Sequence, residues 1–187
     1  MTETTRPTYR PVPAMLDLPA MEREILELWA TQDTFAASLK RTAGGRPWTF
    51  YEGPPTANGM PGTHHIEARV FKDVFPRFKT MQGYHVERKA GWDCHGLPVE
   101  LAVEKELGFN GKPDIEAFGV EAFNAKCRES VSRHVDAFTD LTTRMGYWVN
   151  FDQAYWTMDS AYVESVWWAL KQIHTKGLLV EDYRVAP

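Results

Sequence analysis

The sequence predicts an α/β fold in which a parallel sheet follows a helical N-terminal segment. A strand, a helix and a second strand follow one another over residues 48–88, and parallel strands need a crossover of this kind. A loop rich in glycine and proline follows each of these strands, at the end of an open α/β sheet where ligands bind. Of the 187 residues, 43% are hydrophobic and 25% are charged, which is the composition of a globular domain.

Charge and cysteine content narrow the possible functions. The chain has 21 lysine and arginine residues against 25 aspartate and glutamate residues, a net charge of −4, so a nucleic-acid partner would need a local basic patch or another domain. No apolar run approaches the roughly 18 residues of a membrane span, and the N-terminus lacks the apolar stretch of a secretory signal. Cys94 and Cys127 form no CxxC pair. We therefore expect a protein of the reducing cytoplasm, with no membrane partner and no metal ligands in this chain.

The first 46 residues are expected to form an arm and a packing helix. Residues 1–16 are rich in threonine and proline and show neither a helix nor a strand period. Pro19 suits the first turn of a helix, and apolar side chains then recur at helical spacing as far as the glycines at 44–45. The expected core face of this helix carries Met21, Ile25, Leu28 and Trp29.

The next segment predicts one crossover unit. The β-prone run at residues 48–51 stops at residues 52–62, which are dense in glycine and proline and cannot continue a regular element. Apolar residues then recur at helical intervals as far as Met81, with Pro76 expected to kink or tighten the helix. A second β-prone run at residues 84–88 completes the unit.

A second loop, at residues 90–98, is followed by further helices. A short helix is expected over residues 99–107, and one long helix is expected from Asp114 onward. The long helix carries its apolar residues on a single stripe, which predicts a buried face. That stripe comprises Phe123, Cys127, Val131, Val135 and Phe138.

The last forty residues are rich in aromatic side chains. Residues 147–156 predict no regular element, because their aromatic residues follow no clear period. Asp159 can cap a last helix that ends at Gly177. Residues 178–185 then predict a strand.

Two histidines at the start of the crossover helix point to an anion site. The first turn of a helix offers free backbone N–H groups and the positive end of the helix dipole. His64 and His65 can donate hydrogen bonds to a phosphate there, and Arg69, about one turn later, can add charge. Histidines at a helix start also serve as capping or surface groups, so these residues alone leave both interpretations open.

Two longer motifs resemble the N-terminal catalytic region of class I isoleucyl-tRNA synthetases. The first is Phe-Tyr-Glu-Gly-Pro-Pro-Thr-Ala-Asn-Gly-Met-Pro at residues 50–61, and the second is Lys-Ala-Gly-Trp-Asp-Cys-His-Gly-Leu-Pro-Val-Glu at residues 89–100. The resemblance extends over nearly the whole chain from Pro19. It implies an α/β fold that is the first half of a Rossmann-type parallel-sheet catalytic domain, with an N-terminal helical extension. It divides the chain into an arm and packing helix (1–46), the half-domain (47–146) and the start of an inserted connective or editing region (147–187).

The resemblance also implies an activity and its ligands. The family activates an amino acid by letting its carboxylate attack the α-phosphate of ATP with loss of pyrophosphate, and then passes the acyl group to tRNA. It thus implies isoleucine, ATP with Mg²⁺, and tRNA(Ile) as ligands, and it implies His65 and His64 as catalytic residues. Asp93 would hold the substrate ammonium beside the backbone of Gly53 and Pro54, although an aspartate here can also simply form a turn. The implied ATP-binding residues are Pro55, Thr56, Ala57, Asn58, Gly59, Met60, Pro61, Gly62, Thr63, His64 and His65.

One motif departs from the usual family form, which reads His, any residue, Gly, His. This chain has Gly62-Thr63-His64-His65, so the first histidine and the glycine have changed places. The glycine of the family form lets the nucleotide approach the backbone, and a side chain at His64 would crowd it. The exchanged form resembles that of a subset of isoleucyl enzymes that includes the eukaryotic type and has low sensitivity to pseudomonic acid. We therefore expect a compensated exchange, in which Gly62 makes room where His64 takes it.

A longer complete protein is a further implication of the resemblance. The family carries a second nucleotide signature, Lys-Met-Ser-Lys-Ser, which does not occur in these 187 residues, and zinc would bind only in other parts of the protein. We expect the 187 residues alone to be inactive, and the complete protein to be a cytoplasmic monomer that meets tRNA mostly through other domains. Two alternatives stay open: an inactive truncated paralogue that binds nucleotide or a protein partner, and a small stand-alone nucleotidyltransferase.

Overall fold

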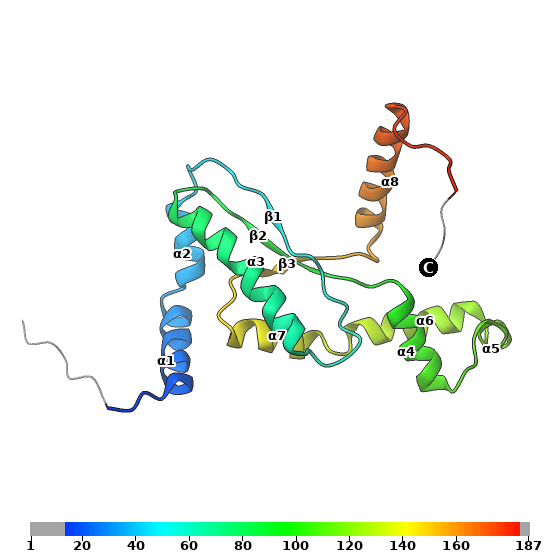
Figure 1. Ribbon diagram of the computed structural model, residues 1–187, viewed down its shortest axis with the longest axis horizontal. Coiled ribbons are helices and arrows are strands. Elements are labelled where there is room, and N and C mark those ends of the chain that lie inside the picture. Colours follow the sequence, from blue (N-terminus) through cyan, green and yellow to red (C-terminus); the bar gives the residue numbers. More distant parts are fainter. Residues whose placement is uncertain (1–13, 184–187) are drawn as a thin grey trace, which may run out of the picture.

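The computed structural model describes residues 14–183 and contains a three-stranded parallel sheet in the order β1-β2-β3 (Figure 1). The strands are β1 (Phe50–Tyr51), β2 (Arg88–Trp92) and β3 (Asn150–Trp156). The helices are α1 (Leu18–Thr31), α2 (Thr34–Arg41), α3 (Thr63–Met81), α4 (Leu97–Leu107), α5 (Lys112–Phe118), α6 (Val120–Ser132), α7 (Val135–Arg144) and α8 (Ser160–Thr175). The predicted α/β class with a parallel sheet is confirmed.

The crossover unit is confirmed, but its strands are shifted. Helix α3 connects β1 to β2, and these strands pair in parallel with Phe50 opposite Arg88. Pro47 and His85 form only an isolated bridge, so the predicted strand at 84–88 is a regular strand only from its last residue onward. Helix α3 continues through Pro76 and ends beside Gly83, whose φ is +87°.

The aromatic segment that predicted no regular element contains β3. This strand pairs with β2, with Gly91 opposite Tyr155 and an irregularity between Lys89 and Gly91. A Cβ atom at Gly91 would lie 2.3 Å from Cζ of Tyr155. Glycine at this position of β2 therefore leaves room for the Tyr155 ring of the neighbouring strand β3. The predicted strand at 178–185 is wrong over residues 178–183, which form no strand; residues 184 and 185 lie outside the described part.

The first predicted helix is in fact two helices. Asp33 adopts a left-handed conformation (φ 47°, ψ 47°) between α1 and α2 and turns the chain there. The expected core face is wrong for three of its four residues, because Met21, Ile25 and Leu28 are each 45% exposed. The fourth residue, Trp29, does pack, with its ring centroid 5.0 Å from that of Trp148. Of the predicted arm, residues 1–13 lie outside the described part.

The predicted long helix from Asp114 is divided into α5, α6 and α7. Gly119, with φ +102°, separates α5 from α6, and α7 begins after His134. The predicted stripe nevertheless packs inward, and four of its five residues meet in one core across the breaks. Val131 and Phe138 are buried in this core, Cys127 and Val135 pack against it, and Phe123 is buried elsewhere.

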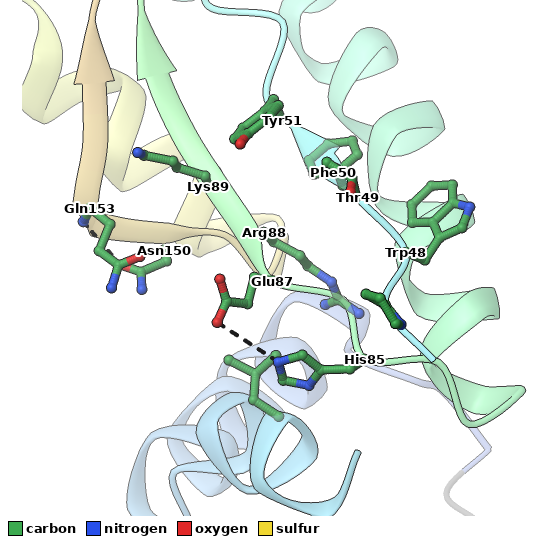
Figure 2. Close-up of a pocket in the computed structure, with 12 residues that line it drawn as sticks. Trp48, Thr49, Phe50, Tyr51, His85, Glu87, Arg88, Lys89, Asn150 and Gln153 are labelled. Atoms are coloured by element: carbon green, nitrogen blue, oxygen red, sulfur yellow. Dashed lines mark hydrogen bonds and ion pairs between the residues drawn. The ribbon is translucent and has the colours of Figure 1, made fainter. Parts of the chain in front are cut away.

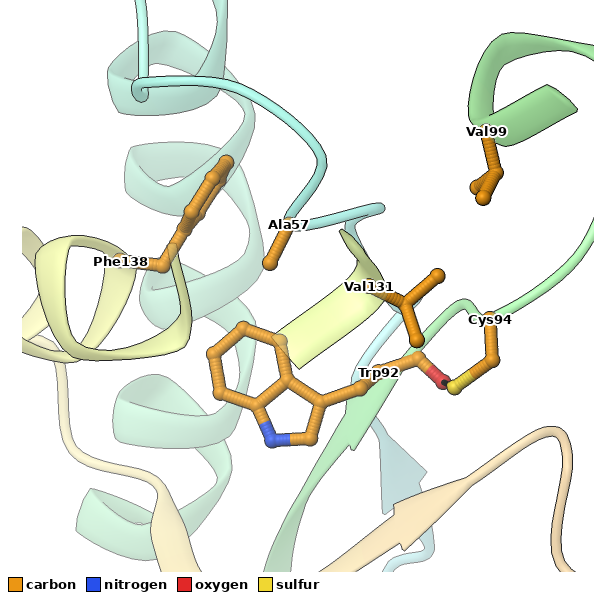
Figure 3. Packing of buried hydrophobic residues seen from close by; sticks show 6 residues of the cluster. All are labelled: Ala57, Trp92, Cys94, Val99, Val131 and Phe138. Carbon is orange, nitrogen blue, oxygen red and sulfur yellow. Dashed lines mark hydrogen bonds between the residues drawn. The ribbon is translucent and has the colours of Figure 1, made fainter. Parts of the chain in front are cut away.

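The main core joins the two loops to the helices that follow them. It comprises Ala57, Trp92, Cys94, Val99, Val131 and Phe138 (Figure 3). Ala57 comes from the first loop and Cys94 from the second, so burial of apolar surface fixes both loops against one another. By contrast, α8 stands apart from the sheet (Figure 1), and its Trp167 and Trp168 are exposed.

Candidate functional site

The two loops meet at the carboxyl ends of β1 and β2, as predicted. Thr56 Oγ1 donates a hydrogen bond to Asp93 Oδ2 at 3.1 Å, and the Asp93 backbone N–H donates to the Pro55 carbonyl at 3.0 Å. A further bond, 3.1 Å long, runs from the Asn58 side-chain amide to the Pro98 carbonyl. These three contacts make one continuous surface from segments about forty residues apart in sequence.

Asp93 is held by donors on several sides. The His95 backbone N–H donates to Oδ1 at 3.2 Å, and Thr157 Oγ1 lies 3.4 Å from the same oxygen. Thr157 is itself buried and accepts a hydrogen bond from the Cys94 N–H at 2.8 Å. The carboxylate is fixed in place yet partly exposed, so it can accept hydrogen bonds from a cationic ligand. Thr157 was not identified from the sequence, because it follows a strand that the sequence did not predict.

His65 is tied into the start of α3. Its Nδ1 accepts a hydrogen bond from the Gly62 backbone N–H at 2.9 Å, and its ring packs edge-on against Phe138 with centroids 4.8 Å apart. Burial lowers the pKa of His65 below its usual 6.5, and the nearby His64, Arg69 and Lys72 lower it further. The imidazole is therefore neutral at neutral pH, and it accepts the backbone N–H of Gly62, the N-cap residue of α3.

His64 is exposed beside it. The two imidazole centroids lie 3.9 Å apart. A Cβ atom at Gly62 would lie 3.1 Å from both Nδ1 and Cε1 of His64, which is closer than ordinary van der Waals contact. The His64 ring thus occupies the space that a side chain at position 62 would need.

Arg69 is buried against α7 and not exposed at this helix start, contrary to the expectation. It is 3% exposed, and its Nε donates to Thr142 Oγ1 at 3.0 Å while the guanidinium lies 5.3 Å from the Phe138 ring centroid. Burial lowers its pKa. Arg69 does lie about one turn after the two histidines on α3, as the helical spacing predicted, but its side chain points toward α7 and the interior.

The remaining predicted loop residues differ in exposure. Ala57 is fully buried, whereas Met60, Thr63 and Gly53 are exposed. A Cβ atom at Gly59 would meet nothing within 4 Å, so no neighbour demands a glycine there. Pro54, Pro55, Thr56, Asn58, Gly59, Pro61 and Gly62 are partly buried.

A buried carboxylate that was not identified from the sequence lies at the start of the first loop. Glu52 is 5% exposed, and its Oε1 lies 2.7 Å from Lys72 Nζ. The Tyr147 hydroxyl donates to Oε2, and the Tyr155 hydroxyl donates to the Glu52 carbonyl at 2.6 Å. Burial and the adjacent Glu52 raise the pKa of Tyr147 far above its usual 10. Glu52 could have been found in the sequence as a charged residue that directly follows a strand, with a lysine on the crossover helix as a possible partner.

A separate cavity of about 490 Å³ lies at the other ends of the strands (Figure 2). Trp48, His85, Arg88, Lys89 and Asn150 contribute to its lining, and His85 Nε2 lies 3.7 Å from Glu87 Oε1. None of the predicted site residues lines it. The candidate site is therefore the surface where the two loops meet, not this cavity.

Neither a metal cluster nor a membrane-spanning helix occurs in the described part of the chain. Between residues 14 and 183, no three histidine, cysteine, aspartate or glutamate side chains are grouped so that they could hold a metal ion. Within the same range, no helix is both long and apolar enough to cross a membrane.

Comparison with known proteins shows that the sequence of this chain matches a protein family. Residues 24–187 match the family described as tRNA synthetases class I (I, L, M and V). Isoleucine–tRNA ligase of Cutibacterium acnes is 75% identical over 179 residues, which are 96% of this chain and 16% of that protein. The enzyme of the same name from Streptomyces coelicolor is 70% identical over 183 residues, which are 98% of this chain and 18% of that protein. The chain thus spans less than a fifth of these relatives.

The fold is also similar to a solved structure. It matches the crystal structure of the ternary complex of Agrobacterium radiobacter K84 agnB2 LeuRS with tRNA and LeuAMS, with a TM-score of 0.56 and 18% sequence identity. The match covers 88% of this chain and 18% of that one. At this identity the likeness concerns the fold alone.

Proposed function

The chain belongs to the class I tRNA synthetases, and we propose that it supplies the amino-acid-activating surface of an isoleucine–tRNA ligase. In that reaction the isoleucine carboxylate attacks the α-phosphate of ATP, pyrophosphate leaves, and the acyl group then passes to tRNA(Ile). The chemistry depends on positioning and on neutralising charge rather than on proton transfer. Because the chain spans 16–18% of its close relatives, this activity is proposed for the complete protein.

The observation that carries the proposal is the meeting of the two loops at Asp93. Its carboxylate has donors from Thr56 and the His95 backbone yet keeps a partly exposed edge. In the proposed site this edge accepts the ammonium of isoleucine, a charge that needs a partner once it is removed from water. The exposed backbone of Gly53, followed by Pro54, lies two residues before the Asp93 contacts begin and would line the pocket beside it.

The N-terminus of α3 would receive the nucleotide. Backbone N–H groups of the first helical turn and the exposed His64 ring can donate to phosphate oxygens. His65 would act by holding the Gly62 amide and thereby the form of the loop over residues 55–65. ATP would enter with Mg²⁺ bound mainly by its own phosphates, as is usual for this ion.

Gly62 and His64 form a compensated exchange in this proposal. The close approach of the His64 ring to position 62 supports it. The named relatives are bacterial, so they lend no support to a eukaryotic-like subtype. What we retain is the local hypothesis that glycine at 62 is required by histidine at 64.

Several wider features are also proposals. The complete protein would be a monomer of the cytoplasm, would meet tRNA mostly through other parts, and would bind zinc only there. The division at residues 46 and 146 is proposed as the domain organisation, with β3 of the third segment joining the sheet. Residues 1–187 alone would lack a complete nucleotide site.

The test is amino-acid-dependent ATP–pyrophosphate exchange. It compares the polypeptide encoded by the complete open reading frame with residues 1–187 alone, each with isoleucine, leucine or valine. We expect exchange that prefers isoleucine in the complete polypeptide and none in the short chain. Exchange that prefers leucine or valine to isoleucine, or none in the complete polypeptide, would refute the proposed function and favour an inactive paralogue or another nucleotidyltransferase.

A further inference from the structure

We infer that Lys72 is a positioning residue that orients the Gly53–Pro54 backbone for the amino acid; this rests on the proposed function. Lys72 projects from α3, and its Nζ lies 2.7 Å from Glu52 Oε1 and 2.8 Å from the Gly53 carbonyl oxygen. One ammonium therefore joins the crossover helix to two consecutive residues of the first loop.

The Glu52 side of this contact is rigidly held. Tyr147 donates to the second carboxylate oxygen and Tyr155 to the backbone carbonyl of the same residue. The Glu52 backbone N–H donates in turn to the Lys89 carbonyl at 3.0 Å. A carboxylate so buried and so fully bonded has one orientation, and it gives the Lys72 ammonium a fixed partner.

The Gly53 side is held by Lys72. Gly53 has no side chain, Pro54 has no N–H, and a Cβ atom at Gly53 would find only the Lys72 side chain within 4 Å. The next fixed point along the loop is the Pro55 carbonyl, bonded to the Asp93 N–H. The peptide unit between Gly53 and Pro54 thus lies between two anchors, and glycine leaves it free to rotate when the ammonium is removed.

The nucleotide part of the loop has supports of its own. Gly62 is bonded to His65, and Asn58 is bonded to the Pro98 carbonyl. Neither contact involves Lys72. Loss of the Lys72 ammonium should therefore weaken binding of isoleucine and leave binding of ATP nearly unchanged.

The experiment uses the polypeptide of the complete open reading frame and measures KM for isoleucine and for ATP in pyrophosphate exchange. For Lys72→Met we expect the isoleucine KM to rise about tenfold, the effect of losing a charge-assisted hydrogen bond, with little change in the ATP KM. Lys72→Arg should restore most of the loss, because it can donate to both oxygens. Lys126→Met is the control, since Lys126 pairs with Glu129 on an exposed helix face.

A double variant separates positioning from stability. Lys72→Met alone leaves the Glu52 carboxylate buried without its cation, which lowers stability. Adding Glu52→Gln should restore much of the melting temperature but not the isoleucine KM, because the Gly53 carbonyl still lacks its donor. If Lys72→Met does not fold, the isoleucine KM of the double variant still tests the inference.

Two results would overturn the inference. One is an unchanged isoleucine KM in a folded Lys72→Met protein, and the other is a double variant in which KM recovers together with stability. Both leave the proposed function standing, because the unmodified protein still exchanges with isoleucine. Absence of that exchange in the unmodified protein would refute the proposed function and this inference together.

Discussion

Thr56 Oγ1 lies 3.1 Å from Asp93 Oδ2, although the two residues are 37 positions apart. This hydrogen bond joins the two glycine- and proline-rich loops beside the proposed ammonium site. Thr56→Val keeps the shape of the side chain and removes the donor. We expect the isoleucine KM in pyrophosphate exchange to rise by about tenfold, because a hydrogen bond to a carboxylate is lost. Thr143→Val, at an exposed position on α7, serves as control, and equal KM values for both variants would count against the role of Thr56.

The Gly62–His64 pair gives a prediction with an internal rescue. Gly62→His places a Cβ atom where the His64 ring lies 3.1 Å away, so the His64 ring must move out of the position it holds at the helix start. We expect a higher KM for ATP in this variant and partial recovery in Gly62→His/His64→Gly, which restores the usual family order. A double variant no better than the single one would show that the two positions are not coupled.

The chain should become less stable toward unfolding as the pH falls, because of His65. Its pKa is lowered in the folded chain from 6.5, so the unfolded chain binds more protons below that pH and stability is lost as the pH falls from 6.5 toward the folded pKa. Protonation of Nδ1 also removes the acceptor of the Gly62 N–H. His65→Gln keeps an acceptor but does not titrate. We expect the urea midpoint of the unmodified chain to drop more than that of the variant between about pH 7.5 and about pH 5.5; parallel curves would exclude this role.

Any side chain at position 91 should lower the stability of the fold. A Cβ atom there would lie 2.3 Å from the Tyr155 ring, and moving that ring would break the hydrogen bond to the Glu52 carbonyl. We expect Gly91→Ala to lower the free energy of unfolding by about 1–3 kcal/mol, the usual cost of overpacking. Gly44→Ala is the matched control, because a Cβ atom at Gly44 would meet nothing within 4 Å. Urea unfolding followed by circular dichroism measures both, and equal stability of the two variants would contradict the packing argument.

The fold was predictable where local signals agreed. Helical periodicity and the stops at Gly83 and Gly108 located α3 and α4, and the loops followed from dense glycine and proline. The break at Asp33 was invisible, because a left-handed conformation there needs no glycine. Strand β3 was missed because aromatic residues on both of its faces hide the alternation that marks a half-buried strand.

The candidate site was predictable in its loops but not in its supports. Motif resemblance pointed to Asp93 and to the helix start, since each of them lies within a contiguous motif. The contacts of Glu52 with Lys72, Tyr147 and Tyr155 join residues 20 to 103 positions apart. No periodicity or spacing along the chain indicates such contacts, which depend on how α3 and β3 pack.

The most direct test of the account is the isoleucine dependence of ATP–pyrophosphate exchange in Asp93→Asn, made in the complete polypeptide. Asparagine keeps the size of Asp93 and one acceptor oxygen, but it carries no charge to pair with an ammonium, and its NH2 group cannot accept as the replaced oxygen does. We predict that kcat/KM for isoleucine falls by about a hundredfold, as for loss of one partner of a buried charge pair, while KM for ATP stays nearly the same. An Asp93→Asn protein with unchanged kcat/KM for isoleucine would contradict the assignment of the loop junction as the amino-acid site.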